Sequence, residues 1–297
     1  MAGLCSNSID GETLEKARRE LNEDPDTREQ VIADFRAAIE EKENDPELEG
    51  VVFERKDSPF LLRFLRAKKF DQSRSLSLYM KYHTIRRDHG KIFTEDDSSA
   101  NLSHILSSGI LYVLNGRTRN GEKVVCIRPE KWDMEQDPAE RMIRTVLLIL
   151  DKLLEDEETQ VHGIRVFEYF QGIEFGQLWK FSQTEAVKNG TFVKILQDST
   201  PIRLKGVHFL CQPWYISLVL TIVKPFMKEK LRQRLHIHGT DFTELHSLMD
   251  TSLLPAELNG TGPPLEYFIA SRLFKDELGE QGGGAEGVVN QNEENEQ

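Results

Sequence analysis

From residue 110 onward, short runs of apolar and β-branched residues alternate with stretches of helical periodicity. The runs that are typical of strands span residues 110–114, 123–127, 164–170, 206–211 and 234–238. Between the second and third runs, residues 138–154 form a helical pattern with a wide apolar face. Strands that alternate with long helices favour an α/β fold with right-handed crossovers. The pattern therefore predicts a mostly parallel sheet flanked by helices.

The part of the chain before this alternation has helical periodicity. Apolar residues recur four positions apart in PFLLRFLRAKKF (59–70), and residues 73–87 read as a further helix. We therefore expect an all-helical N-terminal domain over residues 11–95 and an α/β domain over residues 96–275. Residues 279–297 are glycine-rich and acidic, and this composition predicts a disordered tail.

Net charge and the chain ends restrict the class of protein. The net charge of −12 over 297 residues argues against a nucleic-acid binder, which needs a basic surface. We expect no signal peptide and no lipid anchor, and the longest apolar stretch, residues 214–223, is far shorter than the roughly 20 residues that span a bilayer. Three scattered cysteines are typical of a reduced compartment. The sequence therefore predicts a cytoplasmic protein.

Motifs for catalysis and metal binding are scarce. The sequence contains no phosphate-binding glycine loop, no nucleophile elbow and no HExxH motif. His236 and His238 alternate along a predicted strand, but no Cys or acidic partner follows them at metal-ligand spacing. We therefore expect neither an enzyme nor a metal site.

Residues 201–238 concentrate positive charge. Seven Lys and Arg residues face one acidic residue there, a net charge of +6 in an otherwise acidic chain. In an extended segment Arg203 and Lys205 point to one side, and on a helix Lys230 and Arg234 stack four residues apart. These four cations, if they converge, suit a multiply charged phosphate group. The alternative is a set of solvated surface charges.

The apolar run at 214–223 precedes this basic segment, and Pro225 is expected to break the chain between them. An apolar helix followed by basic residues suits a flap that contacts an anionic membrane; the alternative is a buried core helix. A second cluster, Arg63, Arg66, Lys68 and Lys69, is interpreted as a solvated helix face; the alternative is a functional site.

Glu168 is the least expected polar residue in the predicted sheet. It is in phase with Ile164, Val166 and Phe170, so it shares an apolar face. A carboxylate there must be hydrogen-bonded or have a raised pKa. Two interpretations stay open: a polar group that faces a ligand, or a residue at a strand end that bonds to backbone.

Taken together, these segments resemble the CRAL-TRIO lipid-binding family, in particular its animal branch of tocopherol carriers, retinaldehyde carriers and clavesins. The likeness covers about residues 11–275. Its motifs occur in the family's order: PFLLRFLRAKKFD (59–71), VVCIRPEKW (124–132), LDKLLEDEETQVHG (150–163), LQDSTPIRLKGVHFLCQPWY (196–215), IVKPFMKEKLRQRLHIHG (222–239) and LLPAELNG (253–260).

The resemblance implies a helical N-terminal bundle and an α/β domain that encloses a hydrophobic pocket under a gate helix. It implies phosphatidylinositol bisphosphate binding by Arg203, Lys205, Lys230 and Arg234. The implied pocket residues are Ile143, Val146, Leu150, Ile164, Glu168, Ile195, Leu196, Ile202, Leu204 and Val207. The implied gate spans about residues 213–232 and includes Trp214, Ile216, Leu220, Val223, Phe226 and Met227. In the separate stretch between residues 172 and 198, Asn189 and Gly190 interrupt an expected helix and are expected to reshape one pocket wall.

We therefore expect a monomeric carrier that binds one hydrophobic ligand, needs no other cofactor and docks transiently on phosphoinositide-containing membranes, endosomal ones among them. The ligand stays open between a retinoid, a tocopherol-like lipid and a phospholipid, because Val146 and Leu150 replace serines of the tocopherol carrier. The alternative function is a phosphoinositide-reading adaptor or lipid sensor in vesicle traffic.

Overall fold

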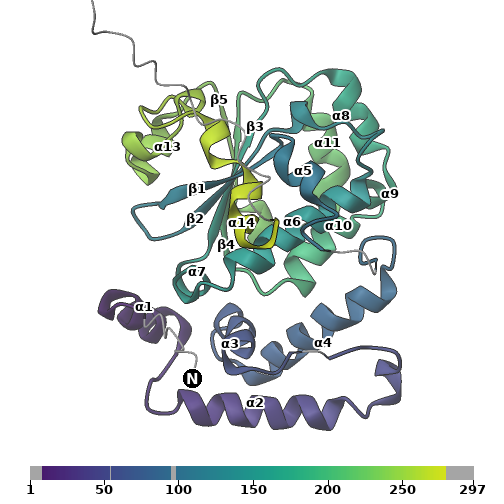
Figure 1. Cartoon of the computed structure of the whole chain (residues 1–297), viewed down its shortest axis with the longest axis vertical. Coiled ribbons are helices and arrows are strands. Elements are labelled where there is room, and N and C mark those ends of the chain that lie inside the picture. The colour runs from purple at the N-terminus through teal and green to yellow at the C-terminus, as the bar shows by residue number, and fades with distance from the viewer. Residues whose placement is uncertain (1–8, 54, 95–97, 279–297) are drawn as a thin grey trace, which may run out of the picture.

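The computed structural model describes residues 9–53, 55–94 and 98–278 (Figure 1). Its N-terminal part is helical and lies below the sheet in Figure 1. The elements of this part are α1 (Gly11–Leu21), α2 (Arg28–Lys42), η1 (Pro46–Leu48), α3 (Ser58–Ala67) and α4 (Gln72–Asp88). Phe60, Phe64 and Tyr79 are buried in one core where their rings meet edge to face. The apolar stripe of residues 59–70 therefore forms the centre of this part.

A five-stranded sheet forms the centre of the second part in the described chain. Its strands are β1 (Leu111–Arg117), β2 (Lys123–Ile127), β3 (Ile164–Tyr169), β4 (Leu204–Leu210) and β5 (Leu235–Gly239). They lie in chain order; β1 pairs antiparallel with β2, and the others pair in parallel. The predicted α/β fold with a mostly parallel sheet is confirmed. β4 begins two residues before the predicted strand because Leu204 pairs with Ile164 of β3.

Helices cover one face of the sheet, and the C-terminal segment covers the other (Figure 1). The first set contains α5 (Ser103–Ser107), η2 (Pro129–Lys131), α6 (Ala139–Leu153), α7 (Glu157–His162), α8 (Phe175–Ser182), α9 (Glu185–Lys188), α10 (Thr191–Lys194), η3 (Ile195–Ser199), α11 (Ile216–Val223), η4 (Lys224–Phe226) and α12 (Glu229–Arg232). The second contains α13 (Thr243–Leu248), η5 (Thr251–Leu253), η6 (Ala256–Leu258) and η7 (Leu265–Phe268). The chain then returns to the first face, where η8 (Ala270–Phe274) packs against α5 and α6 and Glu277 of α14 (Lys275–Leu278) pairs with Lys152 of α6. No helix of the described residues is long and apolar enough to cross a bilayer.

The face under the C-terminal segment is fully packed. Phe167 and Leu210 of the sheet meet Met249 and Leu265 in one buried cluster. Alternation along the strands therefore sends the neighbouring residues, such as Val166 and Phe209, to the opposite face under the helices.

A buried ion network joins the N-terminal helices to the sheet domain. Arg66 of α3 has no solvent exposure, donates to Glu23 at 2.7 and 2.8 Å and to Glu157 of α7 at 3.0 Å, and also donates to Gln160. Arg63 is buried as well. The prediction that these arginines belong to a solvated helix face is wrong, because their helix packs against the second domain.

The predicted domain limits stay a prediction. The limit at residue 95 falls among residues 95–97, and the predicted tail at 279–297 lies wholly outside the described residues.

Candidate functional site

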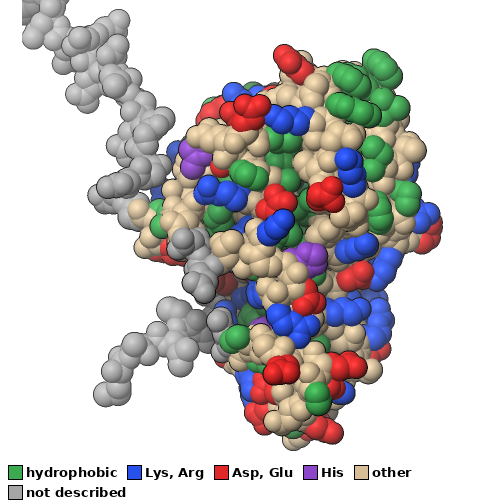
Figure 2. All heavy atoms as spheres, turned by 90° about the vertical axis from the view of Figure 1, so that its right-hand side faces the viewer, with side chains coloured by type: hydrophobic (Ala, Val, Ile, Leu, Met, Phe, Trp, Pro, Cys, Tyr) green, Lys and Arg blue, Asp and Glu red, His purple; other side chains and the backbone are tan. Residues whose placement is uncertain are grey.

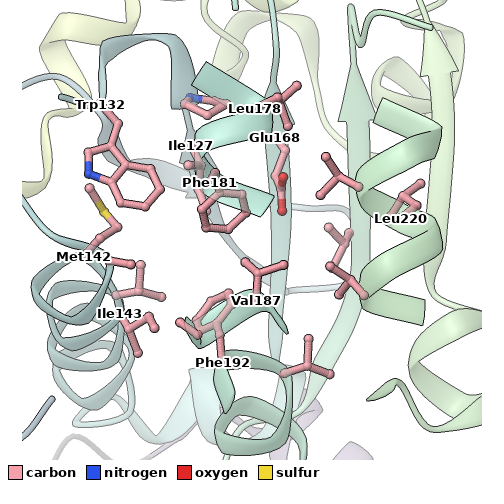
Figure 3. Close-up of a pocket in the computed structure, with 18 of the residues that line it drawn as sticks. Ile127, Trp132, Met142, Ile143, Glu168, Leu178, Phe181, Val187, Phe192 and Leu220 are labelled. Carbon is pink, nitrogen blue, oxygen red and sulfur yellow. The ribbon is translucent and has the colours of Figure 1, made fainter. Parts of the chain in front are cut away.

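A cavity of about 240 Å³ lies between the sheet and the helices that cover it (Figure 3). The sheet contributes Leu111, Ile127, Glu168, Leu204, Val207, Phe209 and Leu235. The α6 side contributes Trp132, Met134, Ala139, Met142, Ile143 and Val146. The segment from α8 to η3 contributes Gln177, Leu178, Phe181, Ala186, Val187, Gly190, Phe192, Val193 and Leu196. The α11 side contributes Ile216, Val219, Leu220, Val223, Met227 and Leu231.

Two of the polar side chains at this wall already have partners. The Trp132 indole N–H donates to the Asp137 carbonyl at 2.8 Å. The Gln177 amide donates to a backbone carbonyl and accepts from the backbone N–H of Glu174. Because the indole N–H and the amide group are already bonded within the protein, the wall presents mainly hydrocarbon to a ligand.

Glu168 is different, because its carboxyl group points into the cavity (Figure 3) and has no hydrogen-bond partner among the described residues. Burial raises the pKa of Glu168 to about 7 from a usual 4.5. The reading in which Glu168 bonds to backbone at a strand end is therefore wrong, and the reading in which it faces the cavity agrees with the geometry.

Six of the ten pocket residues implied by the resemblance line the cavity: Ile143, Val146, Glu168, Leu196, Leu204 and Val207. The other four do not. Leu150, Ile164 and Ile202 pack into the core between α6 and the sheet, and Ile195 packs into the core between α6 and the α9–η3 segment. Contact of a ligand with any of these residues stays a prediction.

The sequence reasoning missed the wall formed by α8, α9 and α10, where Phe181, Val187 and Phe192 face the cavity (Figure 3). These helices are only four to eight residues long, so they carry too few turns for a periodicity signal. The Asn189–Gly190 interruption was the available clue. Gly190 adopts φ +63° between α9 and α10, and this turn directs Phe192 inward.

Four of the six implied gate residues line the cavity: Ile216, Leu220, Val223 and Met227. Trp214 does not, because its side chain is 80% exposed. Phe226 does not line the cavity either. Its ring packs against the turn at Gly190, so closely that a Cβ placed on Gly190 would lie 2.2 Å from the ring. The chain does break before Pro225, where α11 ends and η4 begins. Movement of this segment as a gate stays a prediction.

Exposed apolar side chains surround the outer end of this segment. Phe175 and Trp179 of α8 and Trp214 and Leu218 beside or within α11 are between 44% and 80% exposed; we call these four residues the apolar rim. Tyr215 links the two helices through edge-to-face contacts with Phe175 and Trp214. Figure 2 shows hydrophobic side chains gathered at the upper end of this face. Exposed clusters of this kind mark contact surfaces.

The four predicted headgroup cations lie close together, and the N-terminal part adds to them. We define the basic patch as Arg203, Lys205, Lys230 and Arg234 with Lys68, Lys69 and Arg74. Lys230 and Arg234 do not share a helix as predicted, because α12 ends at Arg232. Arg234 instead donates to the Leu204 carbonyl at the start of β4.

Burial and neighbouring positive charges both lower the pKa values of lysines in the basic patch. Burial, followed by the charge of Arg203, lowers the pKa of Lys205 to about 8. Burial, followed by Arg234, Lys69, Arg203 and Arg74, lowers the pKa of Lys230, and burial with Arg74 and nearby lysines lowers that of Lys68. Cations that lower one another's pKa form a surface that an anion stabilises.

A stack of imidazoles lies on the opposite face of the sheet. His208 of β4 pairs with His236 of β5, and the ligand atoms of His208, His238 and Glu244 lie within 4.8 Å of one another. Because the Arg165 guanidinium can only donate, it faces an unprotonated His208 Nε2 at 2.8 Å, and His208 Nδ1–H donates to His238 at 2.9 Å. A metal on His208 would have to displace that hydrogen bond. The absence of a metal site stays a prediction.

Comparison with known proteins assigns the family. Residues 107–260 match the CRAL/TRIO domain, and residues 31–79 match the CRAL/TRIO N-terminal domain. The chain belongs to the CRAL/TRIO family. CRAL/TRIO proteins bind hydrophobic ligands, which agrees with an apolar cavity.

Named CRAL/TRIO relatives cover most of the chain. Alpha-tocopherol transfer protein-like of Homo sapiens is 38% identical over 263 residues, which are 89% of this chain and 73% of that protein. Clavesin-1 of Xenopus laevis is 37% identical over 269 residues, 90% of this chain and 78% of that protein. The crystal structure of Sfh5 shares the fold, with a TM-score of 0.53, 15% identity, and coverage of 83% of this chain and 92% of that one. The two relatives found by sequence are thus named as a transfer protein-like protein and a clavesin.

Proposed function

We propose that this CRAL/TRIO protein is a cytoplasmic carrier that encloses one hydrophobic molecule and releases or loads it at membranes containing phosphatidylinositol bisphosphate. The observation that carries this proposal is the cavity, whose wall is mainly hydrocarbon and carries the unpartnered carboxyl group of Glu168. Such a wall favours a retinoid, a tocopherol-like lipid or a phospholipid chain over a polar metabolite.

Enclosure of such a ligand is favourable because its apolar surface leaves water, at roughly 25 cal/mol per Å². The cavity of about 240 Å³ is somewhat smaller than typical ligand pockets of roughly 300–1,000 Å³. A long ligand therefore requires an outward shift of the wall. The α11–η4 segment is suited to move, because it combines cavity-lining residues with solvent-exposed ones.

Docking on a membrane would use two surfaces of the protein, the apolar rim and the basic patch. The apolar rim is suited to the membrane interface, and the basic patch to anionic headgroups, at ~1 kcal/mol per Lys or Arg near the surface. A bound headgroup favours opening only if it binds the open state better than the closed state.

The experiment is purification of the protein from its native cells, organic extraction and mass spectrometry of the bound molecule. The extracted molecule is then followed from donor to acceptor liposomes. We expect the protein to accelerate transfer, and Val146→Asp, which places a charge in the apolar wall, to lose the ligand. Absence of a bound lipid, or full loading of Val146→Asp, would contradict the carrier proposal.

A membrane adaptor or lipid sensor is the second candidate, and the basic patch favours it because its seven residues lie outside the cavity wall. The same assay separates the two. An adaptor binds phosphoinositide liposomes but does not accelerate exchange of the extracted lipid between them.

The headgroup assignment has its own test. Changing both Arg203 and Lys205 to Ala is expected to weaken binding to bisphosphate liposomes by roughly tenfold to thirtyfold, since each cation contributes about 1 kcal/mol. Ligand loading stays intact. The matched control changes Arg119 and Lys275, which are exposed elsewhere, and removes the same charge. Equal binding by the two double variants would refute the assignment.

A further inference from the structure

One carboxylate already occupies the basic patch. Glu20, in the last turn of α1, places Oε2 at 3.3 Å from Arg203 Nη2 and at 3.8 Å from Lys205 Nζ. Burial alone would raise the pKa of Glu20, but Lys205, Arg203 and Lys16 together hold it below its usual value. Glu20 is therefore ionised at neutral pH, and its single negative charge is shared between two of the cations proposed to bind a lipid phosphate.

The position of Glu20 allows the carboxylate to leave without unfolding α1. Its side chain is one-third exposed. The helix itself is held by other contacts: Ala17 and Leu21 pack on Val161, and Thr13 and Lys16 bond to His162 of α7. Figure 1 shows α1 beside α7 at the edge of the molecule.

Two further contacts allow the Glu20 carboxylate to move while the rest of α1 stays in place. Glu23, three residues later, is buried against Arg66, which pins the end of α1. Arg19, on the same helix, already lies 3.8 Å from Glu20 Oε1 and can keep the carboxylate paired after it leaves. A rotation of the Glu20 side chain therefore removes the carboxylate from Arg203 and Lys205, while Arg203 stays fixed by its hydrogen bond to the Val161 carbonyl.

We propose that Glu20 is a built-in competitor for the lipid headgroup, and that it restricts docking to headgroups carrying phosphate monoesters. This inference rests on the proposed membrane docking. Because the Glu20 carboxylate is tethered beside the cations, it competes at a high effective concentration. A headgroup binds these cations only in molecules from which Glu20 has moved away, so its apparent affinity is reduced in proportion to that fraction.

The consequence is selectivity among anionic lipids. A phosphate monoester carries about −1.5 to −2 charges at neutral pH and outcompetes a single carboxylate on two cations. Phosphatidylserine carries one net charge and gains little from the exchange. Glu20 thus weakens binding to ordinary anionic membranes more than binding to bisphosphate headgroups.

The test compares wild type, Glu20→Gln and Glu15→Gln as full-length proteins. Glu15 lies on the same helix and is exposed, so the control removes the same charge from the same element. Sedimentation is measured with liposomes of phosphatidylcholine alone, with added phosphatidylserine, and with added phosphatidylinositol bisphosphate. Thermal unfolding of each variant verifies that α1 stays folded.

We expect Glu20→Gln to bind both anionic liposomes more tightly than Glu15→Gln, by roughly twofold to fivefold, the range measured for ion pairs at protein surfaces. The increase in binding is expected to be larger on phosphatidylserine liposomes than on bisphosphate liposomes. Equal binding by the two variants, or weaker binding by Glu20→Gln, would overturn the competitor role. If wild type does not prefer bisphosphate liposomes over phosphatidylserine liposomes, the proposed docking is rejected instead. If no variant binds any anionic liposome, both proposals are rejected.

Discussion

Glu168 combines an apolar setting with an ionisable group. Its pKa of about 7 in the folded protein lies above the usual 4.5, so the folded state binds the proton more tightly than the unfolded state. The stability that this group contributes is therefore fully present below about pH 4.5 and is lost as the pH rises through about 7.

We therefore expect Glu168→Gln to gain stability relative to wild type as the pH rises over that window. The gain reaches at most about 3.5 kcal/mol, since each pKa unit corresponds to about 1.4 kcal/mol. The free energy of unfolding in urea, measured at both ends of the window, checks this. Glu41→Gln, at an exposed position of α2, is the control, and the same pH profile for both variants would contradict an isolated buried carboxyl.

At the scale of elements, the contact between the α9–α10 turn and η4 supports the cavity wall. Gly190 holds φ +63°, and an added Cβ would lie 2.2 Å from the Phe226 ring. Gly190→Ala is therefore expected to cost about 1–2 kcal/mol from the left-handed backbone alone, and to push Phe226 outward. We expect a lower free energy of unfolding and faster loss of the extracted lipid in the absence of membranes.

The control for this prediction is Gly176→Ala in α8, where an added Cβ meets nothing within 4 Å. That change is expected to be neutral or to stabilise slightly. Unchanged lipid loss in Gly190→Ala, despite reduced stability, would mean that η4 does not control the cavity.

The strands were predictable from sequence, and the wall of the cavity only in part. β2 spans the predicted residues because Lys123–Ile127 is short, apolar and bounded by turns. Leu150 and Ile164 pack in the core beside the cavity, and the sequence does not separate the two positions because a side chain facing a core and one facing a cavity are equally apolar. Phe192 was missed because its orientation depends on the turn at Gly190, which is set by tertiary packing.

At the scale of the whole molecule, the basic patch depends on how the two parts are joined. Lys68, Lys69 and Arg74 come from the N-terminal helices, whereas Arg203 and Lys230 come from the sheet domain. Arg66 connects the two through Glu23 and Glu157. The sequence alone assigned Arg66 to solvent, because periodicity does not reveal that a polar helix face meets another domain.

Arg66→Met is expected to leave buried Glu23 with only the longer contact to Arg28, at 3.5 Å, and to cost about 3 kcal/mol, the lower end of the range for a broken buried pair. We expect urea unfolding to split into two transitions, because the N-terminal helices lose their main polar link to α7. Binding to bisphosphate liposomes should also weaken, although every residue of the basic patch is retained, because the two groups of cations no longer hold their relative positions. Arg119→Met removes the same charge from a site that is 60% exposed and is expected to change neither property. Full liposome affinity in folded Arg66→Met would mean that the cations of the sheet domain bind the headgroup without the N-terminal helices.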